Sequence, residues 1–197
     1  KNIKIKNQNS NLIDLNIINE RLFQLILKKC FITDLDLEFY LTKLRKKLLK
    51  KFLLKNDHHF FLKIYNFLIV FAEQNFFSEF IYHESNEEKE LLKKLENEIK
   101  RKDVICELSI LFLSFYKPLN KINYLQTRLD NYVSKSNQFN EFLKYVFLDP
   151  KNDKQVGISL KSISNFSNKT SRLMKTQYEE NPFPRWRYTL RPILGND

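Results

Sequence analysis

Glycine is almost missing from this chain, and that scarcity restricts the folds open to it more than any other feature does. Only two of its 197 residues are glycine, and five are proline. Sheets joined by tight turns, phosphate-binding loops and nucleotide-binding folds all need glycine where φ is positive or where the backbone must approach another group closely. The sequence therefore predicts an all-α protein.

The composition predicts one folded domain with a real core. Hydrophobic residues make up 43% of the chain, which is too apolar for disorder although 29% of the residues are charged. The longest apolar stretch, Val104 to Tyr116, is shorter than the about 20 residues that a membrane-spanning helix needs. The first residues lack the apolar core of a secretory signal. We therefore expect a cytoplasmic protein that contacts no membrane.

Two cysteines, Cys30 and Cys106, have no further cysteine or histidine at ligand spacing. This pattern argues against a disulfide framework and against a structural zinc site. Free cysteine often behaves as a small apolar residue. We expect both to be reduced core residues.

Apolar periodicity and capping signals predict a compact bundle of about six helices over residues 1–150. The clearest signals are an apolar stripe of Leu37, Leu41, Leu44, Leu48 and Phe52 behind a Thr33–Asp36 cap, and a capping box of Ser85 and Glu88. The expected helices are 12–29, the helix that carries the stripe, one from the Asn56–Asp57 cap through Phe71, one from Ser85 to about Arg101, one within 104–116, and shorter ones at 124–133 and 138–147.

Residues 151–197 are expected to form a separate C-terminal part: a hinge, a short helix and an extended arm. The run from Asp149 to Asp153 contains Pro150 and should break the chain, and the Ser/Asn-rich stretch to Thr170 has the composition of a loop. A short helix over 171–180 then precedes a Pro-x-Pro segment with φ fixed at two positions.

The net charge is +11, and part of it lies in five lysines of the second helix. Clustered lysines are typical of phosphate binding, so a nucleic-acid-binding module is one interpretation. Lysines near a helix C-terminus also offset the helix dipole, and an AT-rich genome favours lysine whatever the function. We expect a solvated face. The lysines are Lys43, Lys46, Lys47, Lys50 and Lys51.

No residue pattern identifies a catalytic, metal or cofactor-binding site. The histidines are His58, His59 and His83, and adjacent histidines on a helix point away from each other. The carboxylates of 87–98 alternate with lysines, as on an exposed helix. No glycine-rich loop, nucleophile elbow or zinc signature occurs. A methyltransferase of the common α/β type needs such a loop after its first strand, so the chain should bind no cofactor by itself.

One motif is unusual, the run Gln-Tyr-Glu-Glu-Asn-Pro-Phe-Pro-Arg-Trp at 177–186. Its aromatic rings and guanidinium group suit stacking and the binding of planar or anionic groups, or an arm that docks on a neighbouring domain through its tryptophan. The residues expected to make such an interdomain or partner contact are Tyr178, Asn181, Pro182, Phe183, Pro184, Arg185 and Trp186.

This motif resembles one that precedes the catalytic domain in a family of bacterial S-adenosylmethionine-dependent methyltransferases, many with tetratricopeptide repeats. Phe183 stands where the family usually has tyrosine. Three upstream segments resemble the helical region of the same family: 33–49, 76–82 and 116–119.

The resemblance implies that the chain is the N-terminal helical domain of such an enzyme, recognising a substrate or covering the active site. S-adenosylmethionine and the catalytic residues would then belong to a catalytic domain absent from this chain, in the same polypeptide or in a separate one. Two alternatives stay open: a basic nucleic-acid-binding module, and a stand-alone structural interaction domain.

Overall fold

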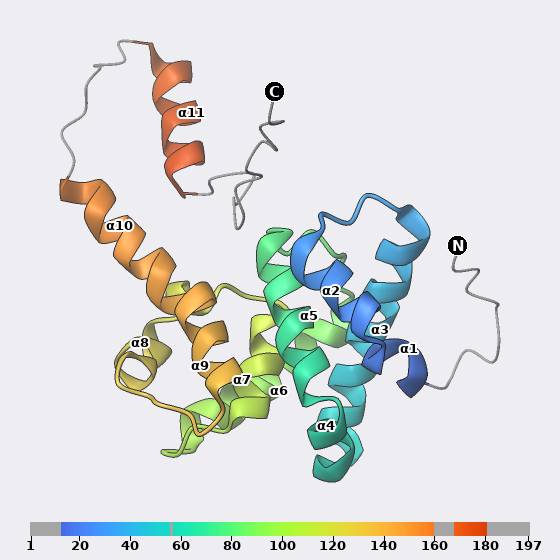
Figure 1. The fold of residues 1–197 in the computed structure, drawn as a ribbon. Helices are drawn as coiled ribbons and strands as arrows, with labels where there is room; N and C mark the ends of the chain where they lie inside the picture. The colour runs from blue at the N-terminus through green and yellow to red at the C-terminus, as the bar shows by residue number, and fades with distance from the viewer. Residues whose placement is uncertain (1–12, 56, 160–167, 181–197) are drawn as a thin grey trace, which may run out of the picture.

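The computed structural model describes residues 13–55, 57–159 and 168–180, and within these ranges the chain is helical with no strand (Figure 1). This confirms the predicted all-α bundle. The helices, in chain order, are α1 (Leu15–Asn19), α2 (Arg21–Lys29), α3 (Leu35–Lys55), α4 (His58–Lys63), α5 (Tyr65–Phe77), α6 (Asn86–Arg101), α7 (Glu107–Ser114), the 3-10 turn η1 (Leu119–Lys121), α8 (Asn123–Asp130), α9 (Asn137–Leu143), the π-helical segment η2 (Lys144–Leu148), α10 (Asp149–Ser159) and α11 (Lys169–Glu180).

Helix α5 is the centre of the bundle. Every residue from Phe67 to Phe76 is buried, because α2, α7 and α9 all pack against this helix. The single helix predicted from the Asn56–Asp57 cap through Phe71 is two helices, α4 and α5, that meet at Ile64. Figure 1 shows α5 between the N-terminal helices and the α7–α9 region.

Aromatic rings fill the space between α3, α4 and α7. The ring of Phe112 stacks on Phe52 at 4.4 Å between centroids and lies edge-on to Phe61 at 5.3 Å and to Phe115 at 5.2 Å. Offset and edge-to-face pairs of this kind stabilise a core beyond the area that they bury. Phe112 of α7 therefore joins the consecutive helices α3 and α4 to a helix that lies much later in the sequence.

The predicted N-terminal cap and apolar stripe of α3 are confirmed. Leu41, Leu44 and Leu48 of the stripe are buried, and Leu37 and Phe52 are half-buried against the core. Asp34 accepts a hydrogen bond from the Leu37 backbone N–H at 2.8 Å, as a capping residue does.

The predicted continuous helix over 12–29 is wrong, because the chain forms two helices, α1 and α2. The chain leaves helical geometry at Glu20, so that Phe23 and Leu27 are buried while Leu22 is exposed. The Gln24 side chain donates to the Ile18 carbonyl at 2.9 Å and so satisfies a group that the break leaves open.

The predicted chain break at Asp149–Asp153 is also wrong, because helix α10 occupies Asp149–Ser159. Pro150 lies in the first turn of α10, where a residue without an N–H donor is tolerated. The π-helical segment η2 precedes it, so the chain remains helical through the proline. The rest of the predicted hinge, residues 160–167, lies outside the described residues, whereas the short helix expected at 171–180 is confirmed as α11.

The expectation that both cysteines are core residues is wrong for Cys30, which is exposed; Cys106 is half-buried. Both are free thiols. Cys30 directly follows α2 and its backbone N–H bonds to the Ile26 carbonyl, so it lies at the end of the apolar face rather than on it. No helix in the described parts of the chain is both long and apolar enough to cross a membrane.

Candidate functional site

Most of the residues expected to contact a partner lie outside the described part of the chain. Asn181, Pro182, Phe183, Pro184, Arg185 and Trp186 are among these. Tyr178 belongs to α11, and the structure describes its backbone only. The predicted contact role of the motif therefore stays a prediction.

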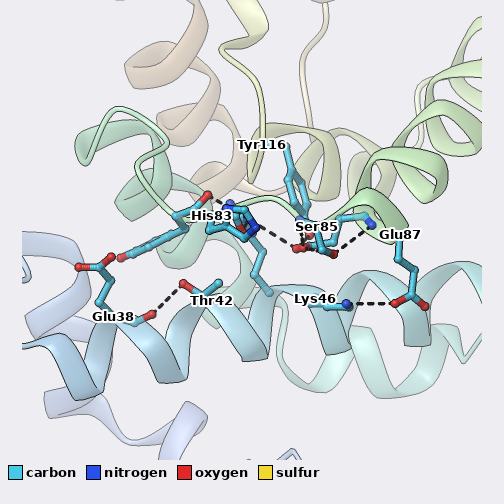
Figure 2. Close-up of polar contacts among 10 residues, drawn as sticks. Glu38, Thr42, Lys46, His83, Ser85, Glu87 and Tyr116 are labelled. Carbon is cyan, nitrogen blue, oxygen red and sulfur yellow. Dashed lines mark hydrogen bonds and ion pairs between the residues drawn. The ribbon is translucent and has the colours of Figure 1, made fainter.

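Lys46, Lys50 and Lys51 of α3 form ion pairs. Lys46 and Lys50 bind the Glu87 carboxylate of α6, at 3.0 Å and 2.5 Å, and Lys51 binds Asp57, the N-cap of α4, at 2.9 Å. Lys50 and then Lys46 lower the pKa of Glu87. Figure 2 shows Lys46 and Glu87 facing each other between the two helices. These lysines therefore join helices to each other.

The three histidines do not gather with other metal-binding side chains. Within the described ranges, no group of three or more His, Cys, Asp or Glu residues could hold a metal ion. His83 contributes to a polar cluster through its backbone, because its carbonyl accepts a hydrogen bond from Arg45 at 2.8 Å.

Arg45 is the centre of a buried polar cluster that joins α3, α6 and the end of α7. Figure 2 labels three residues around it, His83, Ser85 and Tyr116. Only 1% of the Arg45 side chain and 2% of Glu88 are exposed, and Arg45 Nη2 lies 3.5 Å from Glu88 Oε1. The guanidinium carbon lies 4.1 Å from the centroid of the Tyr116 ring, and the Tyr116 hydroxyl donates to Glu88 Oε1 at 2.8 Å. A charge this deeply buried is stable only with such partners.

The predicted capping box is confirmed, and it serves this cluster. The Ser85 backbone N–H and hydroxyl donate to Glu88 Oε2 at 2.9 Å and 2.7 Å, and Glu88 N–H is directed at the Ser85 hydroxyl at 3.4 Å. Burial raises the pKa of Glu88, but the bonds from Ser85 and Tyr116 and the charge of Arg45 outweigh it, so the pKa lies below its usual value of 4.5. Glu88 is therefore an ionised carboxylate in the core.

Arg45 also holds the turn that connects α5 to α6. Glu79 and Phe80 have φ of 55° and 59°, which is the left-handed region that residues other than glycine rarely occupy. Past this turn, the carbonyls of Tyr82 and His83 accept hydrogen bonds from Arg45 at 3.2 Å and 2.8 Å. The cluster thus fixes a strained connection, and its role in the described structure is to position helices.

A second polar cluster, around Glu107 at the first turn of α7, opens to solvent. Tyr65 and Tyr132 donate their hydroxyls to its carboxylate, at 2.9 Å for Tyr132, and the hydroxyl of Ser134 donates to the same oxygen as Tyr132. Burial and the bond to Glu107 raise the pKa of Tyr132 to about 12, and the same causes raise the pKa of Tyr65 further.

The Glu107 carboxylate lines an open pocket of about 490 Å³, together with both tyrosines. Its wall also includes two exposed apolar residues, Leu62 and Val133, and the residues Ser134, Lys135 and Ser136. Sequence reasoning missed this pocket, because its lining comes from α4, α5, α7 and the connection between α8 and α9. The one available signal was that Glu107 is the sole charged residue in the apolar stretch Val104–Tyr116.

Comparison of the chain with protein-family models, with curated proteins and with solved structures finds no match.

Proposed function

We propose that this chain is a helical domain that serves an S-adenosylmethionine-dependent methyltransferase, recognising the substrate or covering the active site of a catalytic domain that carries the cofactor. The domain then contacts the substrate or the catalytic domain and supplies no catalytic residue. It works in the cytoplasm, where the cofactor is available to the catalytic domain.

One observation carries the proposal: the three upstream segments that resemble the methyltransferase family meet at a single place. Arg45 belongs to the segment 33–49, the Tyr82 carbonyl to 76–82, and Tyr116 to 116–119. In the fold, Arg45 Nη2 lies 3.2 Å from the Tyr82 carbonyl oxygen, and the Arg45 guanidinium carbon lies 4.1 Å from the centroid of the Tyr116 ring. Segments scattered over more than 80 residues thus share one structural role, as expected if the resemblance reflects a common helical domain.

The lysine pairs of α3 weaken the nucleic-acid alternative. Lys46 and Lys50 share one carboxylate, and Lys51 pairs with Asp57. A phosphate would have to compete with these carboxylates, so the five lysines offer less binding energy than their number suggests. The net charge of +11 alone favours only weak, salt-sensitive association.

Two titrations test the proposal. S-adenosylmethionine is titrated calorimetrically into the chain alone, where we expect no binding, and into a mixture of the chain with the polypeptide encoded next to residue 197 or in the neighbouring gene. Binding and methyl transfer by the mixture, with a turnover that falls when the chain is omitted, would support the proposal. Micromolar binding by the chain alone, or no methyltransferase in either place, would overturn it.

A further inference from the structure

The pocket around Glu107 contains a carboxylate that lacks a cationic partner. The side chain is half-buried, and within the residues that the structure describes it forms no ion pair. Its hydrogen bonds all come from neutral hydroxyl groups, those of Tyr65, Tyr132 and Ser134. Hydroxyl donors stabilise an anion but do not cancel its charge, so the pocket keeps an attraction for a positive group.

The hydroxyl donors also restrict the geometry of a ligand. A carboxylate has about four acceptor positions. Oε1 accepts from both Tyr132 and Ser134, whereas Oε2 accepts from Tyr65 alone, so about one position on Oε2 stays free. A guanidinium group binds best through two parallel hydrogen bonds to both oxygens, whereas an ammonium group makes a single point contact. The free acceptor therefore suits an ammonium group.

The walls of the pocket match the rest of such a ligand. Tyr65 and Tyr132 contribute aromatic rings, which attract cations. Leu62 and Val133 line the same pocket and are 64% and 81% exposed, so both offer apolar surface that a bound alkyl chain would cover. Lys135 also lines the pocket, and its charge lowers the affinity for any cation, so we expect weak binding. The pocket is open rather than enclosed, as suits a side chain presented by a polypeptide.

We propose that the Glu107 pocket binds the side chain of a single lysine from a partner polypeptide, with the ammonium group on Glu107 Oε2 and the methylene chain against Leu62 and Val133. This inference goes beyond the proposed methyltransferase role and does not depend on it.

Peptide titrations followed by ¹H–¹⁵N correlation spectra test the inference on the full chain. The probe is acetyl-Ala-Lys-Ala-amide, and the matched control is the same peptide with norleucine, which keeps the methylene chain and lacks the charge. We expect the lysine peptide to shift the amides of Tyr132, Val133 and Lys135, with a Kd of about 1 mM as suits one side chain. The norleucine peptide should bind at least about tenfold more weakly, the loss of one charge-assisted contact. The arginine peptide should also bind more weakly than the lysine peptide, because Oε1 already accepts two hydrogen bonds and a two-bonded guanidinium pair cannot form.

Two sets of variants assign the binding to this pocket. Glu107→Gln keeps the shape of the side chain and should weaken the lysine peptide about tenfold. Because this change also disturbs three hydroxyl donors, a second pair avoids the interior: Val133→Lys should weaken binding and Val133→Glu should strengthen it, each about threefold for a charge about 6 Å from the ammonium group in water. Val156→Lys, an exposed valine of α10, is the control and should have no effect.

Equal affinity for the lysine and norleucine peptides, or shifts that avoid residues 132–135, would overturn the inference. So would an affinity that the two Val133 charges leave unchanged. Preference for the arginine peptide would overturn the assignment to an ammonium group. None of these results bears on whether the chain serves a methyltransferase, which the cofactor titrations decide separately.

Discussion

Replacing Glu88 by Gln tests the physical account of the buried cluster. The substitution keeps the size of the side chain and removes the charge that faces Arg45, of which only 1% is exposed. Arg45 then remains charged in the core, with the carbonyls of Tyr82 and His83 as its acceptors. Glutamine also presents an amide nitrogen where one carboxylate oxygen accepted a bond from Ser85 or Tyr116.

The expected cost follows from these contacts. Removing one partner of a buried ion pair destabilises a protein by about 3–5 kcal/mol. The Arg45–Glu88 distance of 3.5 Å is longer than in the strongest pairs, and Arg45 keeps two acceptors, so we expect the lower end, about 3 kcal/mol. For a chain of this size, each kcal/mol lowers Tm by about 2–4 °C, which gives a decrease of about 6–12 °C.

Thermal and urea unfolding followed by far-ultraviolet circular dichroism measure this loss. Glu90→Gln is the matched control, because Glu90 lies on the same helix and pairs with Lys93 while 68% and 71% of the two side chains are exposed. An exposed pair contributes about 0–1 kcal/mol, so this variant should unfold almost as the parent does. The double variant Arg45→Met/Glu88→Gln should be more stable than Glu88→Gln alone, because no unpaired charge is left in the core. A loss for Glu88→Gln below about 1 kcal/mol, equal to that of the control, would refute the reasoning.

Three further predictions concern pH and packing. Folding lowers the pKa of Glu88, so the stability that this group contributes is present above its unfolded pKa, near 4.5, and is lost as the pH falls through the lower folded value. Unfolding curves between pH 6 and 3 should therefore show a steeper decrease in the free energy of unfolding for the parent than for Glu88→Gln. Folding raises the pKa of Tyr132 to about 12, so the stability that this group contributes is present below pH 10 and is lost as the pH rises through about 12. Absorbance titration at 295 nm should show a lower pKa for this tyrosine in Glu107→Gln, and an unchanged titration would contradict the hydrogen bond between Tyr132 and Glu107. Phe112→Ala should cost about 3–5 kcal/mol in urea unfolding because it leaves a cavity among three rings, and Phe112→Leu clearly less; equal losses would show that the cavity does not set the cost.

Local signals made much of the fold predictable. The Ser85–Glu88 capping box and the Leu41–Leu44–Leu48 stripe depend on residues within a few positions of each other, so the sequence carries them completely. The interruption at Glu20 was missed because the apolar periodicity continues through it. Pro150 was interpreted as a break because the sequence does not show whether a proline lies inside a helix or in its first turn. That depends on the conformation of the preceding residues, here the π-helical segment η2.

The polar clusters could not be predicted, because their members meet only through packing. Arg45 stands in a run of lysines, and nothing in that run distinguishes the one cation that becomes buried. Glu88 was recognised as a cap, but its partners Arg45 and Tyr116 lie 43 and 28 residues away. The same holds for Glu107, whose donors lie 25 to 42 residues from it. Long-range polar contacts of this kind have no period in the sequence.

The central position of α5 makes the bundle indivisible. Helix α2 on its N-terminal side and helices α7 and α9 on its C-terminal side all pack on the same 13 residues, so a cut anywhere between α2 and α9 leaves one fragment without the surface that it needs. Neither half should fold by itself, and the two should reassemble only when mixed. The amide hydrogens of α5 should exchange with solvent only when the whole molecule opens, and their exchange rates then report the global free energy of unfolding.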